Sequence, residues 1–193
     1  MKSISRKDRN EFKFIESKKV IAVEKRILIF FGKTGAGKSY TAKIFGQEFG
    51  YYLYDADLDL TVEMREAIET GQVFTAEMRT AYFEVIKEKT KALLKSNLKI
   101  ALAQGFFKNR NRQEFMEEFP FAKFIWVDAD DGILERRILR RNSSVTLEYA
   151  RRINQLFETP DFNCEKIINN GGTEELLNEA RKTEAKLYYL GDY

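Results

Sequence analysis

The sequence predicts an α/β protein with an open five-stranded parallel sheet, helices on both faces and a small helical lid. Three observations lead to this prediction. Short apolar runs alternate with longer segments of helical periodicity, a pattern typical of β–α units on a parallel sheet. A glycine-rich loop follows the first apolar run and precedes a helical segment. The 193 residues, 44% of them hydrophobic, contain no Pro-, Gly- or Ser-rich linker and suit one compact domain.

The chain begins with a basic extension, residues 1–26, ahead of the main domain, residues 27–193. The extension carries nine basic and four acidic residues, a net +5, which leaves a net −2 for the rest. Two interpretations stay open: a solvated lead-in, or a recruitment surface for an anionic partner. Its alternating stretches, residues 12–14 and 20–23, are candidates for an edge strand or hairpin.

The main domain contains five apolar segments short enough to be strands. They are residues 27–31, 51–54, 100–103, 122–127 and 166–168. Helical spacing of apolar residues connects them, at Met78–Leu93 and again at Leu147–Phe157. Gly50 stands where a left-handed residue ends the first helix.

Composition excludes several classes of function. The 33 basic and 30 acidic residues give a net charge of only +3, which argues against a nucleic-acid partner. The absence of histidine removes Ser-His-Asp chemistry and nearly every zinc site. The single cysteine, Cys164, excludes an internal disulfide and fits a reducing, cytoplasmic location. The longest apolar run, Ile27–Phe31, is far shorter than the ~20 residues of a membrane span, so no membrane association is expected.

The most informative segment runs from Gly32 to Ser39 and matches the phosphate-binding pattern G-x-x-x-x-G-K-[ST]. Its glycines allow backbone N–H groups to point at phosphate oxygens, and the following helix adds a positive N-terminus. We expect Lys38 to reach the β- and γ-phosphates of ATP and Ser39 to hold Mg²⁺. The domain is therefore predicted to be a P-loop NTPase. The expected nucleotide-binding residues are Gly32, Lys33, Thr34, Gly35, Ala36, Gly37, Lys38, Ser39 and Tyr40.

Acidic clusters follow two of the predicted strands. Asp55 and Asp57 close the second, and Asp128 follows the fourth. Because ligands of open parallel sheets collect at the carboxyl ends of strands, one of the first pair can serve as base and the other can hold Mg²⁺ through water. Helix-capping turns are the competing interpretation for both clusters. In a further alternative, that of an ATPase, Asp128 holds Mg²⁺. A GTPase is disfavoured because residues 109–112 lack the carboxylate that reads guanine.

Four arginines lie within residues 136–141. Arg137 and Arg141 are four apart, so on a helix they share a face, while Ile133, Leu134 and Ile138 form its buried side. We expect residues 136–146 to form a mobile lid whose two arginines neutralise the transferring phosphoryl group. A solvated helix face is the alternative and accounts for at least two of the four.

The order of P-loop, Asp-x-Asp and basic lid resembles the small-molecule kinases that include gluconate, shikimate and dephospho-CoA kinases. Residues 55–57 resemble shikimate and dephospho-CoA kinases, and residues 64–79, 104–112 and 155–160 resemble gluconate kinases. The resemblance implies that Arg79 and Arg112 bind an anionic group of the acceptor. Gluconate kinases carry Gly-His-Phe in the lid, where this chain has residues 142–144 as Asn-Ser-Ser.

The combined prediction is an ATP- and Mg²⁺-dependent phosphotransferase whose acceptor is a hydroxyl of a small polar metabolite. The catalytic candidates are Lys38, Asp57, Asp55, Arg137 and Arg141; the metal candidates are Ser39 and Asp55; the acceptor candidates are Asp57, Arg79 and Arg112. Two alternatives stay open: a dephospho-CoA-kinase-like enzyme, and a nucleotide-binding switch or ATPase. A homodimer is also left open.

Overall fold

The computed structural model describes residues 24–141 and 143–188, and these contain one five-stranded parallel sheet in the order β2-β3-β1-β4-β5. The strands are β1 (Arg26–Phe31), β2 (Tyr52–Asp55), β3 (Lys99–Ala103), β4 (Ala122–Asp128) and β5 (Glu165–Ile168). Each lies within one residue of its predicted bounds. The phosphate-binding loop therefore follows the central strand, whose residues Ile27–Phe31 are fully buried.

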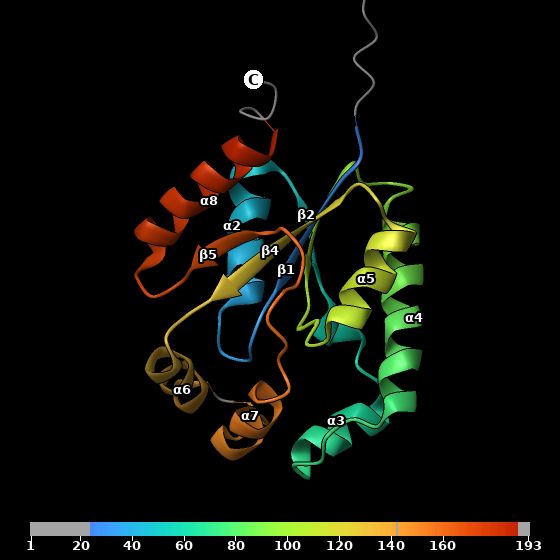
Figure 1. Cartoon of the computed structure of the whole chain (residues 1–193), viewed down its shortest axis with the longest axis vertical. Helices are drawn as coiled ribbons and strands as arrows, with labels where there is room; N and C mark the ends of the chain where they lie inside the picture. Colours follow the sequence, from blue (N-terminus) through green and yellow to red (C-terminus); the bar gives the residue numbers. More distant parts are fainter. Residues whose placement is uncertain (1–23, 142, 189–193) are drawn as a thin grey trace, which may run out of the picture.

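Helices cover both faces of the sheet, as predicted (Figure 1). They are α2 (Lys38–Phe49), α3 (Val62–Glu69), α4 (Ala76–Leu93), α5 (Asn109–Glu118), α6 (Asp131–Arg140), α7 (Leu147–Asn154) and α8 (Thr173–Tyr188), with a 3-10 turn η2 (Ala56–Asp59). One half of the core, against α2 and α8, includes Phe30, Phe45 and Ala180. The other half, against α4 and α5, includes Ile86 and Phe115.

Three shorter helices, α3, α6 and α7, gather beyond the carboxyl ends of the strands (Figure 1). Threonine side chains start two of these helices. Thr61 accepts a hydrogen bond from the Met64 N–H at 3.3 Å, and Thr146 accepts one from the Tyr149 N–H at 3.1 Å. The predicted left-handed end of α2 is confirmed, because Gly50 has φ 74° and donates its N–H to the Gly46 carbonyl.

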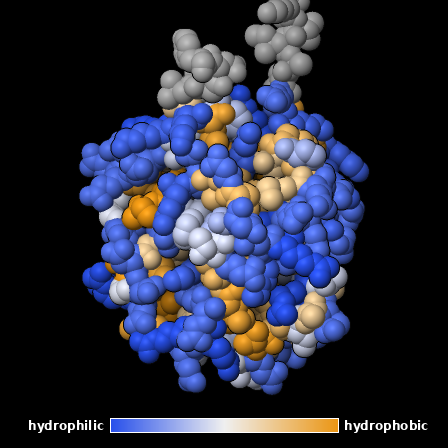
Figure 2. Space-filling view, viewed as in Figure 1, coloured by the Kyte–Doolittle hydropathy of each residue, from blue (hydrophilic) through white to orange (hydrophobic). Residues whose placement is uncertain are grey.

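The start of the sheet lies one residue before the predicted boundary at residue 27. Arg26 is the first residue of β1, and its N–H donates to the Leu98 carbonyl at 2.8 Å. The stretches expected to form an edge strand or hairpin, residues 12–14 and 20–23, lie outside the described residues. None of the described helices is long and apolar enough to cross a membrane, and the face in Figure 2 is mostly hydrophilic with scattered apolar patches.

Candidate active site

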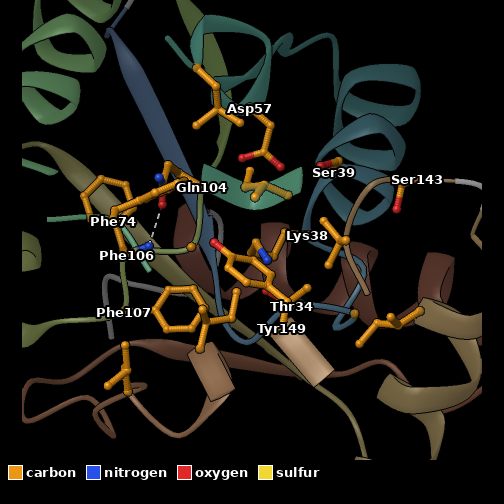
Figure 3. Close-up of a pocket in the computed structure, with 18 of the residues that line it drawn as sticks. Thr34, Lys38, Ser39, Asp57, Phe74, Gln104, Phe106, Phe107, Ser143 and Tyr149 are labelled. Carbon is orange, nitrogen blue, oxygen red and sulfur yellow. Dashed lines mark hydrogen bonds between the residues drawn. The ribbon is translucent and has the colours of Figure 1, made fainter. Parts of the chain in front are cut away.

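A pocket of about 880 Å³ opens at the carboxyl end of the sheet. Its lining comes from the phosphate-binding loop, η2, α3, the start of α4, the loop after β3, the end of α6 and the segment that leads into α7. Figure 3 shows Lys38, Ser39 and Asp57 facing this cavity from two different strand ends. The topology therefore brings the predicted loop and one predicted carboxylate to the same end of the sheet, although β3 lies between the two strands that carry them.

The phosphate-binding loop needs its glycines for two reasons. Gly35 and Gly37 have φ values of 91° and 92°, a region that only glycine adopts without strain. A Cβ on Gly35 would lie 2.9 Å from the Leu134 carbonyl oxygen, and one on Gly37 would lie 2.4 Å from Asn169 Nδ2. No side chain caps α2 at Gly37, so the N–H groups of its first turn are oriented to bind an anion.

Lys38 extends along this loop into the pocket. Its Nζ donates to the Lys33 carbonyl at 3.0 Å. Burial lowers the pKa of the Lys38 ammonium, and the carboxylates of Asp57 and Asp55 oppose this shift. Lys33 itself faces outward and pairs with Asp131 at 3.2 Å. Of the two lysines in the loop, Lys38 is thus the one that can meet a phosphate in the pocket.

The two carboxylates after β2 differ in position. Asp57 lines the pocket, whereas the Oδ1 of Asp55 accepts the Asp57 N–H at 3.2 Å and caps η2. Desolvation in the cavity raises the pKa of Asp57, and the nearby Lys38 and Arg141 oppose the rise. Asp57 therefore has the surroundings of an acid–base group. Asp55 makes the helix-capping contact that is the alternative to a role in catalysis or metal binding.

Asp128, the metal ligand in the ATPase alternative, has other partners. Its Oδ1 accepts the Ala129 N–H at 3.0 Å, and its Oδ2 pairs with Lys166 Nζ at 2.9 Å. It is absent from the pocket lining. The geometry gives no support to the alternative in which Asp128 holds Mg²⁺.

Two of the four clustered arginines line the pocket, as expected, but not through a shared helix face. Arg137 lies on α6 and donates to the Ala36 carbonyl at 3.3 Å and to Asn169 Oδ1 at 3.2 Å. Helix α6 ends at Arg140, and Arg141 follows in an extended conformation, so the predicted helical pairing is wrong. Arg141 reaches the pocket from the loop instead.

The remaining features of this segment match their predictions in part. Leu134 and Ile138 are buried, whereas Arg136 and Arg140 are exposed and form the solvated face of α6. An ion pair between Arg151 and Glu135, 2.6 Å long, joins α7 to α6. Asn142 lies outside the described residues, and the mobility expected of residues 136–146 stays a prediction.

Arg79 and Arg112, the two arginines implied to bind the acceptor, have different positions. Arg79 lines the pocket, with one guanidinium N–H donated to the Phe74 carbonyl. Arg112 is fully buried and does not line the pocket. Its guanidinium donates to the carbonyls of Phe106 and Glu158 at 2.7 and 2.8 Å. The structure gives no support to the expectation that Arg112 binds the acceptor, because the guanidinium is fully enclosed and donates to backbone carbonyls and to the Asn109 side chain.

Two asparagines outside the Gly32–Ser39 motif contact the phosphate-binding loop. The Asn154 side chain, at the end of α7, binds both backbone polar groups of Thr34. Its Oδ1 accepts the Thr34 N–H at 2.8 Å, and its Nδ2 donates to the Thr34 carbonyl at 3.2 Å. Asn169, after β5, donates to the Ala36 carbonyl at 2.8 Å. Asn169 follows a predicted strand, which is a weak signal, whereas nothing in the local sequence marks Asn154.

Comparisons with known proteins show the family and the fold that this chain is similar to. The family model described as shikimate kinase matches residues 34–182. A curated shikimate kinase of Bartonella quintana (strain Toulouse) is 26% identical over 137 residues, which cover 70% of this chain and 63% of that protein. The aligned part of this chain thus spans less than two thirds of that relative's length.

Solved structures show the same fold. An unliganded sugar kinase from Janibacter sp. HTCC2649 superposes with a TM-score of 0.72 at 18% identity, covering 83% of this chain and 94% of the other. A gluconokinase from Sinorhizobium meliloti 1021 gives a TM-score of 0.69 at 19% identity, covering 86% of this chain and 97% of the other. At these identities the likeness concerns the fold alone.

Proposed function

Because the chain belongs to the shikimate kinase family, we propose that the protein transfers the γ-phosphoryl group of ATP to a hydroxyl of a small polar metabolite. The observation that carries this proposal is the shared pocket: Lys38, Ser39 and Asp57 face one cavity that also has a separate wall for a second molecule. In the reaction the acceptor oxygen forms a bond to the γ-phosphorus, the bond to the bridging oxygen of ADP breaks, and the acceptor proton passes to a base.

The nucleotide side of the pocket fits a triphosphate. The glycine-lined loop and the uncapped start of α2 present N–H groups, and Lys38 adds a positive charge. The Ser39 hydroxyl, together with Asp55 through water, would hold Mg²⁺, which neutralises charge on the phosphates when bound. Within residues 24–141 and 143–188 no group of three or more His, Cys, Asp or Glu side chains is placed to hold a metal ion.

Asp57 would orient the acceptor hydroxyl and accept its proton. It lines the pocket beside the loop, and desolvation there raises its pKa above the ordinary carboxyl value, which makes the carboxylate a stronger base. Arg79, which also lines the pocket, would bind an anionic group of the acceptor. Arg137 and Arg141 would stabilise the charge that develops on the phosphoryl group.

The test compares Lys38→Ala with Lys43→Ala, a matched change at an exposed position of the same helix. The assay measures acceptor-dependent ADP release with sugar acids, shikimate, dephospho-CoA and nucleosides. We expect Lys38→Ala to lower turnover by about 10²-fold or more while the circular dichroism spectrum is unchanged, and Lys43→Ala to be fully active. Full activity of Lys38→Ala would contradict the proposal.

The same assay separates the kinase from a nucleotide-dependent switch, the second candidate. A kinase lacking residues 1–20 should retain its acceptor-dependent turnover. A switch would hydrolyse ATP slowly, would show no acceptor that accelerates turnover, and would lose a partner bound through the basic extension.

A further inference from the structure

The Asn154 side chain, at the end of α7, is complementary to the backbone of one residue of the phosphate-binding loop. Its Oδ1 accepts the Thr34 N–H at 2.8 Å, and its Nδ2 donates to the Thr34 carbonyl at 3.2 Å. A primary amide presents one acceptor and one donor side by side, whereas a carboxylate has no donor. The contact therefore fixes both peptide groups that flank Thr34.

The first of these peptide groups, between Lys33 and Thr34, also contacts Lys38. Its carbonyl accepts Lys38 Nζ at 3.0 Å and the Ala36 N–H at 3.2 Å, while its N–H is the one bound by Asn154. Because a peptide group is rigid and planar, a rotation at its N–H end would also move the carbonyl that Lys38 contacts. Asn154 is thus connected to the Lys38 ammonium through one peptide group. Figure 3 shows Thr34 and Lys38 at the cavity.

The second peptide group lies between Thr34 and Gly35. No cis peptide bond occurs among the described residues, so the Thr34 carbonyl and the Gly35 N–H point in opposite directions. The carbonyl is turned toward Asn154, which does not line the pocket, whereas Gly35 does. The Gly35 N–H is thereby directed to the pocket side of the loop. Asn169 makes a similar contact two residues later, where its Nδ2 donates to the Ala36 carbonyl at 2.8 Å.

From these contacts we infer that Asn154 is a positioning residue for the phosphates of the nucleotide: it sets the direction of the Gly35 N–H and the place of Lys38 before the nucleotide binds. The inference rests on the proposed function and assigns to α7 a role at the phosphate site. Asn154 acts through the loop backbone and does not touch the phosphates itself. Without its amide both peptide groups can rotate, and binding of the β- and γ-phosphates, which Lys38 reaches, must then pay for ordering them.

The experiment compares Asn154→Leu, which keeps most of the side-chain volume, and Asn154→Ala with the control Arg151→Met on the same helix. Arg151→Met removes the exposed ion pair with Glu135 that joins α7 to α6 and leaves the loop contact intact. Calorimetric titration of the full chain measures binding of a non-hydrolysable ATP analogue, of inorganic triphosphate and of AMP.

We expect both Asn154 variants to bind the ATP analogue and triphosphate about tenfold more weakly, since two hydrogen bonds that orient the loop are lost. Both should bind AMP as the parent does, because AMP lacks the β- and γ-phosphates. Arg151→Met should leave all three affinities unchanged.

A second measurement separates the positioning of Lys38 from a general loosening of the fold. The ATP analogue is titrated into Lys38→Ala with and without Asn154→Leu. If Asn154 acts through Lys38, part of its effect is absent when Lys38 is absent, so Asn154→Leu should weaken binding by only about threefold or less in this background. A role unconnected with Lys38 would weaken binding by the same factor in both backgrounds.

Four results would overturn the inference: parent-like triphosphate binding by both Asn154 variants, equal weakening of AMP and triphosphate binding, the same losses in Arg151→Met, or equal factors in the two Lys38 backgrounds. All are binding measurements that require no acceptor. If the variants behave as expected but no alcohol stimulates ADP release, the proposed phosphoryl transfer fails while the role of Asn154 in phosphate binding stands.

Discussion

Replacement of Arg112 by methionine tests whether this side chain stabilises the fold or binds the acceptor. The side chain is fully buried, and its guanidinium donates to three backbone carbonyls, those of Phe106, Phe107 and Glu158, at 2.7, 3.3 and 2.8 Å. Burial lowers the pKa of Arg112 to about 10, so the group remains cationic at neutral pH. Methionine fills much of the same space but leaves the carbonyls without a donor.

The magnitude follows from these contacts. Each buried polar group left without a partner costs about 1–3 kcal/mol. The guanidinium also lies over the rings of Phe31 and Phe157, 4.7 and 4.8 Å from their centroids, and loss of such stacking costs about 0.5–2 kcal/mol each. Removal of a buried charge returns part of this cost. Loss of one partner from a buried charged contact costs about 3–5 kcal/mol of unfolding free energy in total, which lowers the melting temperature by roughly 6–20 °C for a chain of this size.

The assay is thermal and urea unfolding of Arg112→Met beside Arg110→Met, the exposed arginine on the same helix. We expect a large loss of stability in the first variant only, with an unchanged KM for the acceptor in the fraction that is folded. A variant at Arg112 that is as stable as the parent but has a raised acceptor KM would refute the structural role and restore the role implied by the family resemblance.

Three further predictions concern the phosphate-binding loop and the base. Gly37→Ala should abolish binding of an ATP analogue in a calorimetric titration. The backbone at this position is left-handed, and the added Cβ would lie 2.4 Å from Asn169 Nδ2. Normal affinity would contradict this prediction. Asn154→Ala should raise the KM for ATP several-fold with little change in fold, because two hydrogen bonds to the backbone of Thr34 are lost. Steady-state kinetics with varied ATP measures this KM, and an unchanged value would show that the contact is dispensable. The pKa of Asp57 is raised and the base acts only when ionised, so kcat/KM should fall as pH drops through a pKa above the ordinary carboxyl value. Asp57→Asn should remove this decrease at low pH together with most of the activity. The folded state favours the protonated form of this carboxyl, so its contribution to stability is lost as pH rises, and Asp57→Asn should unfold at a higher temperature than the parent at neutral pH.

The positions of the strands and of the phosphate-binding loop could be predicted from the residues alone. The central strands β1 and β3 are short apolar runs buried on both faces of the sheet, whereas the edge strands β2 and β5 are short runs with several exposed residues. The loop from Gly32 to Ser39 is specified by local backbone requirements: glycine at positive φ, and a lysine and a hydroxyl at the start of a helix. Such features depend on residues within a few positions of each other, so they can be predicted from the sequence.

Which polar side chains are available to a ligand depends on how distant segments of the chain pack together. Arg112 and Arg65 both lie near predicted site segments. Arg112 is buried and donates to the carbonyl of Glu158, 46 residues away in sequence, whereas Arg65 lines the pocket. Asn154 holds the Thr34 peptide across 120 residues of sequence. The physical reason is that burial and hydrogen-bond partners arise from contacts between segments distant in the chain, and a guanidinium or amide has the same local signature whether the backbone or a substrate occupies its donors.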